Sequence, residues 1–142
     1  MKVSARNVFK GKVREVRPGA VNSEVILELA GGETLVAVVT VESVASLGLA
    51  PGVAAVALVK APWVMLMTED SDIRLSARNC LPGTVASVTD GAVNAEVVLS
   101  LAGGAQVSAI VTRDAVQELG LVPGAKATAV IKASHVILGV PA

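Results

Sequence analysis

The sequence is poor in the residues that most catalytic and nucleic-acid-binding sites need. Its 142 residues include no tyrosine, one phenylalanine, one tryptophan, one histidine and one cysteine. Proteins that bind single-stranded nucleic acid stack bases on aromatic side chains within a basic groove, whereas this chain has a net charge of +0 from 12 basic and 12 acidic residues. One cysteine forms no internal disulfide, and one cysteine with one histidine cannot build a zinc site. We therefore expect no nucleic-acid partner and no protein-bound metal ion.

Long apolar runs and catalytic motifs are absent as well. No apolar run reaches the ~18 residues of a membrane span, and the N-terminus lacks the pattern of a signal peptide. The sequence has no phosphate-binding loop of the Walker type. Its single histidine, His135, is expected on a strand, outside any arrangement of nucleophile and base that both halves of the chain could form. These absences predict a cytoplasmic protein that does not contact membranes and is not an enzyme.

What the sequence has in excess is small aliphatic residues. Hydrophobic residues make up 53% of the chain, and the mean hydropathy is +0.68. We interpret the excess apolar surface as a subunit interface and predict an oligomer. Cys80 is expected to be a small buried hydrophobic residue, because it corresponds to Val8 in the repeat described next.

The chain repeats itself with an offset of 72 residues. Residues 4–7 (Ser-Ala-Arg-Asn) return as 76–79, residues 19–22 (Gly-Ala-Val-Asn) as 91–94, and residues 60–61 (Lys-Ala) as 132–133. The register holds without a gap from residues 2–67 to residues 74–139. A unit of this length is near the lower limit for an independent core. We predict two domains, residues 1–67 and 74–142, joined by a short acidic linker at residues 68–73.

Each copy has the pattern of five strands and one short helix. In the first copy the expected strands lie at about residues 3–16, 24–29, 34–39, 53–59 and 63–67. The helix follows the third strand, because Thr40 is suited to cap its N-terminus and Gly48 to end it. The pairs Gly31-Gly32 and Gly103-Gly104 are expected to form hairpin turns. This element order predicts an all-β fold of two tandem OB-fold-like five-stranded barrels, each with one short helix between strands 3 and 4.

Hydrogen-bond donors recur in register in both copies. In the first copy they are Ser4 and Arg6 before a strand, Thr40 and Ser43 at a helix start, and Lys60 followed by the small residue Ala61. Donors without neighbouring acceptors suit a fully deprotonated oxyanion and disfavour phosphate, which is partly protonated at pH 7. In one copy alone, ordinary surface charges and a strand-end cap would be the better explanation of these residues. Their recurrence favours an anion site. Glu24 and Glu96 are expected to form strand-edge or interface hydrogen bonds, not to act as acid or base.

The recurring motifs resemble the molbindin (Mop) domain of the transport-associated OB group. The resemblance rests on Ser-Ala-Arg-Asn, on Gly-Ala-Val-Asn-x-Glu-Val and on Lys-Ala-x-x-Val, each present twice and in order. It implies binding of molybdate, and of tungstate as well, for storage or homeostasis and without enzymatic activity. It also implies a homotrimer of six barrels in which oxyanions are held between subunits.

The resemblance assigns site residues in both copies. The first set is Ser4, Arg6, Thr40, Ser43, Lys60 and Ala61, and the second is Ser76, Arg78, Thr112, Ala115, Lys132 and Ala133. Ala115 stands where the first copy has Ser43, so the second set loses a hydroxyl donor. A second kind of oxyanion site near the three-fold axis would use two turns, although turn geometry explains their residues equally well. These residues are Gly19, Ala20, Val21, Asn22, Gly91, Ala92, Val93 and Asn94.

Two other classes of function stay open at the level of sequence. One is a regulatory or interaction module whose bound oxyanion controls the assembly of a partner protein. The other is an enzyme, such as one that inserts metal into a cofactor, and the missing acid–base residues count against it. The sequence shows no fused effector domain, which favours a storage protein over a regulator.

Overall fold

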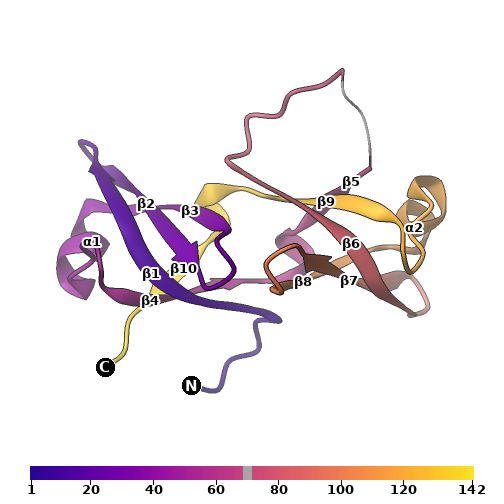
Figure 1. Ribbon diagram of the computed structural model, residues 1–142, viewed down its shortest axis with the longest axis horizontal. Coiled ribbons are helices and arrows are strands. Elements are labelled where there is room, and N and C mark those ends of the chain that lie inside the picture. The colour runs from indigo at the N-terminus through magenta and orange to yellow at the C-terminus, as the bar shows by residue number, and fades with distance from the viewer. Residues whose placement is uncertain (69–71) are drawn as a thin grey trace.

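The computed structural model describes residues 1–68 and 72–142, so residues 69–71 of the predicted linker lie outside the described residues. It contains two five-stranded antiparallel sheets, and helices α1 and α2 lie at opposite ends of the molecule (Figure 1). The first repeat comprises β1 (Asn7–Pro18), β2 (Asn22–Leu29), β3 (Thr34–Thr40), α1 (Val41–Leu47), β4 (Ala54–Val59), the 3-10 helix η1 (Ala61–Trp63) and β5 (Met65–Met67). The second comprises β6 (Asn79–Asp90), β7 (Asn94–Leu101), β8 (Gln106–Thr112), α2 (Arg113–Leu119), β9 (Lys126–Ile131), the 3-10 helix η2 (Ala133–His135) and β10 (Ile137–Gly139).

The all-β prediction is confirmed, including the helix between the third and fourth strands of each copy. Thr40 caps α1 by accepting a hydrogen bond from the backbone N–H of Ser43 at 3.0 Å, and Gly48 ends the helix at φ 64°. The expected hairpin turns are present, with Gly32 at φ 93° and Gly104 at φ 96°. A positive φ is easily reached only by glycine, so these positions depend on it.

Alternation along the strands buries one side of each curled sheet in a hydrophobic core that both repeats share. Val25, Leu27 and Leu35 of the first repeat are at most 1% exposed, and their counterparts Val97, Leu99 and Val107 are all 0% exposed. The prediction that Cys80 is buried is wrong, because its side chain is exposed. Alternate residues of a strand face opposite sides, and on β6 Asn79 and Leu81 take the buried side.

The first strand is shorter at its start than predicted. β1 begins at Asn7, not at about residue 3. Pairing of β1 with β4 starts at Asn7 opposite Val59, where β4 ends, so residues 3–6 have no partner strand there. Ser4 and Arg6 therefore lie in the segment that leads into β1.

The fifth strands are exchanged between the two repeats. β5 pairs with β9 of the second repeat, and β10 pairs with β4 of the first, so the C-terminal end of the chain returns to the first sheet (Figure 1). The predicted fifth strand at residues 63–67 is only partly right, since Trp63 ends η1 and the strand begins at Met65. The prediction that His135 lies on a strand is wrong, because His135 ends η2. Each 3-10 turn contacts the other repeat, η1 at β8 and η2 at β3, and thereby directs the following strand to the opposite sheet.

Two buried asparagines join the repeats by reciprocal hydrogen bonds. The side chain of Asn79 donates to the carbonyl of Val36 at 2.8 Å and accepts from the N–H of Val36 at 2.7 Å. Asn7 makes the same two bonds with Ser108, also at 2.8 and 2.7 Å. Both asparagines are 2% exposed. Each amide thus satisfies backbone groups on the third strand of the other repeat, and those of Val36 would otherwise be buried without partners.

The hairpin turns of the two repeats also meet. A Cβ on Gly31 would overlap the backbone of Gly103, and a Cβ on Gly103 would overlap Gly31 and the Glu33 carboxylate. That carboxylate accepts a hydrogen bond from the N–H of Gly103 at 2.7 Å. The first glycine of each pair is therefore needed for close backbone packing, whereas the second is needed for its dihedral angle.

None of the described helices has the length and apolar character that crossing a bilayer requires.

Candidate functional site

Four of the predicted oxyanion-binding residues of the second copy line one surface hollow. Ser76, Arg78, Lys132 and Ala133 surround a space of about 400 Å³. They meet because Asn79 at the start of β6 pairs with Ile131 at the end of β9. The residues just before β6 and just after β9 are therefore neighbours. Strand pairing, which joins residues far apart in the sequence, builds this site.

The hollow also contains residues of the first repeat. Val38 on β3 and Met65 on β5 contribute to its lining. Met65 is 57% exposed, and Leu75, which lines the same hollow, is 45% exposed. Basic and hydroxyl groups are thus surrounded by exposed apolar side chains, a combination that is typical of surfaces covered by another protein.

The first repeat places its corresponding residues in the same way. Asn7 pairs with Val59, so Arg6 lies next to Lys60 at the same end of the sheet. Ala61 follows as the first residue of η1 and is 1% exposed. Ser4 lies two residues before Arg6 in the exposed segment that leads into β1.

The helix-start residues lie apart from the other donors of their own repeat. Thr40 pairs with Asn22, at the opposite end of the β1–β2 hairpin from Asn7. At ~3.3 Å per residue, β1 corresponds to roughly 36 Å of strand between the two ends. In the second repeat Thr112, which caps α2 through the N–H of Ala115 at 3.1 Å, is paired in the same way with Asn94. One repeat therefore does not bring its six predicted residues together.

The donors at the helix start of the first repeat lie closer to the hollow of the second repeat. Val38, which lines that hollow, is two residues before Thr40 on β3, or about 7 Å along a strand. The Thr40 hydroxyl also donates to the Ser43 hydroxyl at 2.8 Å, so the capping pair keeps the Ser43 hydroxyl hydrogen available for another acceptor. Donors of the first repeat at the start of α1 thus lie nearer to the hollow of the second repeat than to the other donors of their own repeat.

The two turns predicted as a second kind of site adjoin the helix starts. The N–H of Val41 bonds to the carbonyl of Val21 at 2.9 Å, and the N–H of Arg113 bonds to that of Val93 at 2.9 Å. Val21 and Val93 are 73% and 71% exposed. A Cβ on Gly19 would approach the Asn22 carbonyl to 2.5 Å, so turn geometry accounts for that glycine. Ala20, Asn22, Gly91, Ala92 and Asn94 are all exposed as well.

Carboxylates lie beside both predicted arginine ligands, which corrects the expectation of donors without neighbouring acceptors. Arg6 contacts the carboxylate of Glu96 at 2.7 and 2.8 Å. Arg78 forms the equivalent ion pair with Glu24. Each pair joins one repeat to the other. The expectation that both glutamates form interface hydrogen bonds is confirmed, whereas an acceptor now lies next to each site and weakens the argument against protonated phosphate.

These ion pairs are exposed enough to open at little cost. The side chains of Arg6 and Arg78 are 57% and 48% exposed, and exposed pairs contribute about 0–1 kcal/mol. Glu24 also has Arg17 within 3.5 Å, so it keeps a cationic neighbour when Arg78 turns toward an anion. The guanidinium groups are therefore available to a divalent oxyanion, which carries a larger negative charge than a carboxylate and attracts them more strongly.

Arg17 also shifts the pKa of a second carboxylate, that of Glu15. It donates two hydrogen bonds to Glu15, at 3.0 and 3.2 Å, and these bonds lower the pKa of Glu15 and raise the pKa of Arg17. A lowered carboxyl pKa contributes stability that is present at neutral pH and is lost as the pH falls through the folded-state value. At neutral pH the Glu15 carboxylate therefore stays charged beside Arg17.

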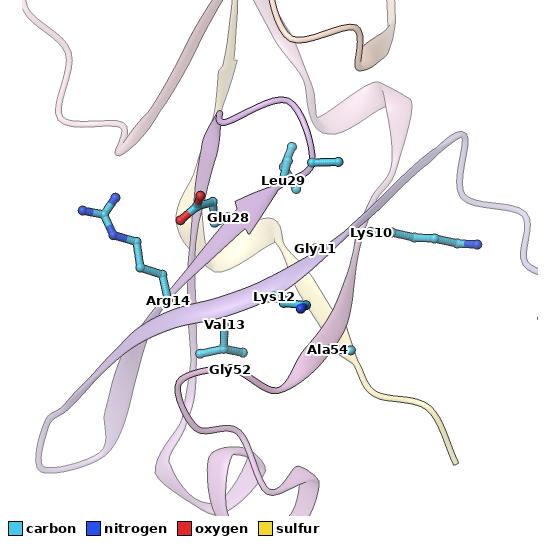
Figure 2. A pocket seen from close by; sticks show the side chains of 10 residues that line it. Lys10, Gly11, Lys12, Val13, Arg14, Glu28, Leu29, Gly52 and Ala54 are labelled. Carbon is cyan, nitrogen blue, oxygen red and sulfur yellow. The ribbon is translucent and has the colours of Figure 1, made fainter.

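A larger hollow lies on the outer side of the first repeat. It has a volume of about 560 Å³ and is lined by Lys10, Lys12 and Arg14 of β1 together with Glu28 of β2. Figure 2 shows that the three basic side chains point in different directions and do not converge on one point. The second repeat has Pro82, Thr84 and Ala86 at these positions. The larger hollow is therefore not a repeated oxyanion site.

One aromatic cluster beside the site was missed by the sequence analysis. Trp63 and His135 occupy the same position in the two copies, and their rings lie 5.1 Å apart at 32°. The ammonium group of Lys60 lies 5.3 Å from the centre of the Trp63 ring. The 72-residue offset pairs Trp63 with His135 but gives no sign that equivalent residues touch each other across the interface.

Comparison with known proteins decides the family. The model of the TOBE domain matches the chain twice, at residues 3–66 and 75–138. The chain belongs to the TOBE domain family. The two TOBE matches are separated by the same 72 residues as the repeat, and together they cover most of the chain. Resemblance to tandem Mop-type proteins, expected from the motifs, is thereby confirmed.

Two relatives of this TOBE protein are named for molybdenum or its oxyanion, and a third is named as a transcriptional regulator. A crystal structure of the cytoplasmic molybdate-binding protein ModG, with molybdate bound, is 63% identical, covers 99% of this chain and 100% of ModG, and has a TM-score of 0.97. The molybdenum-pterin-binding protein MopA of Rhodobacter capsulatus is 48% identical over 141 residues, 99% of this chain and 53% of MopA. The transcriptional regulator ModE of Yersinia pestis is 37% identical over 139 residues, 97% of this chain and 52% of ModE. The chain spans about half the length of these two curated relatives.

Proposed function

We propose that this protein binds molybdate and tungstate in the cytoplasm and stores or buffers the ion without chemical change. One observation carries the proposal: Ser76, Arg78, Lys132 and Ala133 meet in one hollow, in a chain whose relative ModG binds molybdate. Arg78 and Lys132 supply positive charge, and Ser76 supplies a hydroxyl donor. Charge-assisted bonds of this kind contribute roughly 1.5–3 kcal/mol each. The first repeat offers the same set in Ser4, Arg6, Lys60 and Ala61.

The site is completed by a second subunit. Its donors form two groups, one around Arg78 and Lys132 and one at the starts of α1 and α2, the two helices at opposite ends of the molecule (Figure 1). Exposed apolar residues surround both groups, namely Met65, Leu75, Val21 and Val93. A homotrimer would cover these residues and bring the two groups of donors of neighbouring subunits together. It would hold each oxyanion away from bulk water. Hydrogen bonds to the charged ion are stronger in such an environment than in water.

A regulatory module is the second candidate. Its support is the similarity to the transcriptional regulator ModE, which extends over 97% of this chain. In that case the bound oxyanion would change the affinity of this protein for a partner. A partner captured only in the presence of molybdate would favour the regulator over the store.

Calorimetric titration tests the proposed function most directly. Purified protein is titrated with molybdate, with and without a large excess of sulfate. Tight binding at more than one ion per chain, unchanged by sulfate, supports an oxyanion store. The absence of heat, or heat that sulfate abolishes, would mean that the recurring donors are structural or bind anions loosely.

Replacing one arginine should remove some of the sites and leave the rest. Arg6→Ala and Arg78→Ala each delete one guanidinium group while leaving the buried core unchanged, so each variant should fold and bind fewer molybdate ions per chain. The matched control is Arg14→Ala, on the outer side of β1 away from the sites. The stoichiometry is measured by calorimetry. A full complement of ions in both single variants contradicts the site assignment.

The assembly makes a separate prediction. Light scattering during gel filtration should give three times the chain mass of 14.3 kDa at micromolar concentration. Met65→Lys should lower the measured mass, because it puts a charge into a surface that the trimer covers. A monomeric mass for the unmodified protein contradicts binding between subunits.

A further inference from the structure

The cluster of Lys60, Trp63 and His135 makes the two repeats unequal at the proposed oxyanion sites. Lys60 is a proposed ligand of the first site, and its ammonium group lies over the indole ring of Trp63. The corresponding lysine of the second site is Lys132, and the residue that corresponds to Trp63 is His135. In residues 1–68 and 72–142, Lys60 is the one cation that lies over an aromatic ring.

We propose that Trp63 is a positioning residue that holds Lys60 ready for the oxyanion and gives the first site a higher affinity than the second. This inference rests on the proposed function of the same residues. Lysine loses side-chain entropy when it is fixed, and a contact with an indole face fixes part of the side chain before the anion arrives. An ammonium group has three donors, so the ring face leaves donors free for the ligand.

The ring that holds Lys60 is itself held. Trp63 is partly buried against the core of the two repeats, and His135 packs on it at 5.1 Å. The Nδ1 atom of His135 is buried and has no hydrogen-bond partner within the described part of the chain. The imidazole therefore acts at this position as a packing surface for the indole, and its edge is not anchored elsewhere.

The second site lacks this arrangement because it has an imidazole, His135, where the first site has the indole of Trp63. Tryptophan gives the strongest attraction for a cation among the side chains, while the imidazole of His135 faces Trp63. Lys132 consequently stays mobile until an anion binds. The two sites then differ in the entropy that each lysine loses, although both present the same charged groups.

The chain contains one tryptophan, so its emission reports on the surroundings of Trp63, which include the ammonium group of Lys60. When an oxyanion draws the Lys60 ammonium toward itself, the charge near the indole changes and the emission of Trp63 should change with it. Lys60→Met should abolish this change, whereas Lys132→Met should preserve it. A role for Trp63 in folding alone would not produce this difference between the two lysine variants.

The experiment titrates the full chain with sodium molybdate and follows both heat and tryptophan emission. Trp63→Leu should weaken the tighter class of sites about two- to fivefold, the range expected of an exposed cation–π contact, and leave the weaker class unchanged. Trp63→Phe keeps a ring face and should restore most of the affinity, and it guards against a packing defect in Trp63→Leu. His135→Trp should tighten the weaker class.

The outcomes separate this inference from the proposed function. Absence of heat in the unmodified protein overturns the proposed function and the inference with it. Heat of binding with unchanged emission, or an equal loss at both classes in Trp63→Leu and Trp63→Phe, overturns the inference and leaves the oxyanion store intact.

Discussion

Deletion of residues 137–142 should loosen the first sheet, although the deleted residues belong to the second repeat. The deletion removes β10, which pairs with β4 at Leu58, Ala57 and Val56. It also removes Leu138, which is 8% exposed and part of the core. Loss of a buried leucine costs about 2–5 kcal/mol, and the unpaired strand edge adds to that cost. We expect the free energy of unfolding to fall by at least about 3 kcal/mol.

Hydrogen exchange locates the effect. Amides of β4 should lose protection, while those of β9 should keep it, because β9 retains its pairing with β5. The matched control deletes only Pro141 and Ala142, which are exposed and should change neither. Loss of protection in β9 with β4 unaffected would mean that each repeat closes its own sheet and would contradict the exchange of strands.

Replacement of Asn79 by alanine should be the most destabilising change of a single polar side chain. It leaves the N–H and the carbonyl of Val36 buried without partners, and each such group costs about 1–3 kcal/mol. We expect a loss of about 3 kcal/mol in the free energy of unfolding, measured by urea denaturation. The loss should be smaller for Asn7→Ala, because the equivalent bonds to Ser108 are only partly buried.

The control for Asn79→Ala is Asn94→Ala, since Asn94 is exposed at the start of β7. Its effect should stay within about 0.5 kcal/mol, as for most surface substitutions. Equal losses in Asn79→Ala and Asn94→Ala would show that the buried amide contributes little to the contact between the repeats. A large fall in the free energy of unfolding for Asn79→Ala alone would show that this side chain joins the second repeat to β3.

The strands and helices could be predicted because the residues that begin and end each element lie within or directly beside it in the sequence. Thr40 and Gly48 bound a seven-residue helix, and paired glycines mark each hairpin. The exchange of fifth strands could not be predicted in this way. Each copy carries a three-residue strand soon after its 3-10 turn, and the edges of β4 and β9 are equivalent partners for it. Contacts between the repeats, such as the packing of η1 on β8 and of η2 on β3, distinguish the two pairings, and these contacts join residues far apart in the sequence.

The candidate site, too, could be predicted only in part from the sequence. Register of the repeat was enough to select Ser76, Arg78, Lys132 and Ala133, which the structure places around one hollow. It was not enough to find the carboxylates, because Glu24 lies 54 residues from Arg78 and Glu96 lies 90 residues from Arg6. Those contacts depend on how the repeats face each other. The prediction for Cys80 is wrong because an aliphatic counterpart in the other repeat does not require burial, and Val8 is itself 40% exposed.

The exchange of strands also determines when the protein can finish folding. The first sheet needs Ile137–Gly139, which lie roughly 80 residues beyond β4 in the sequence. At ~5–20 residues per second of synthesis, β4 waits several seconds with an open edge. During that interval a neighbouring nascent chain offers the same strand as the chain's own C-terminus. Ribosomes close together on one message would therefore favour pairing between chains, whereas slow initiation would favour the closed single chain.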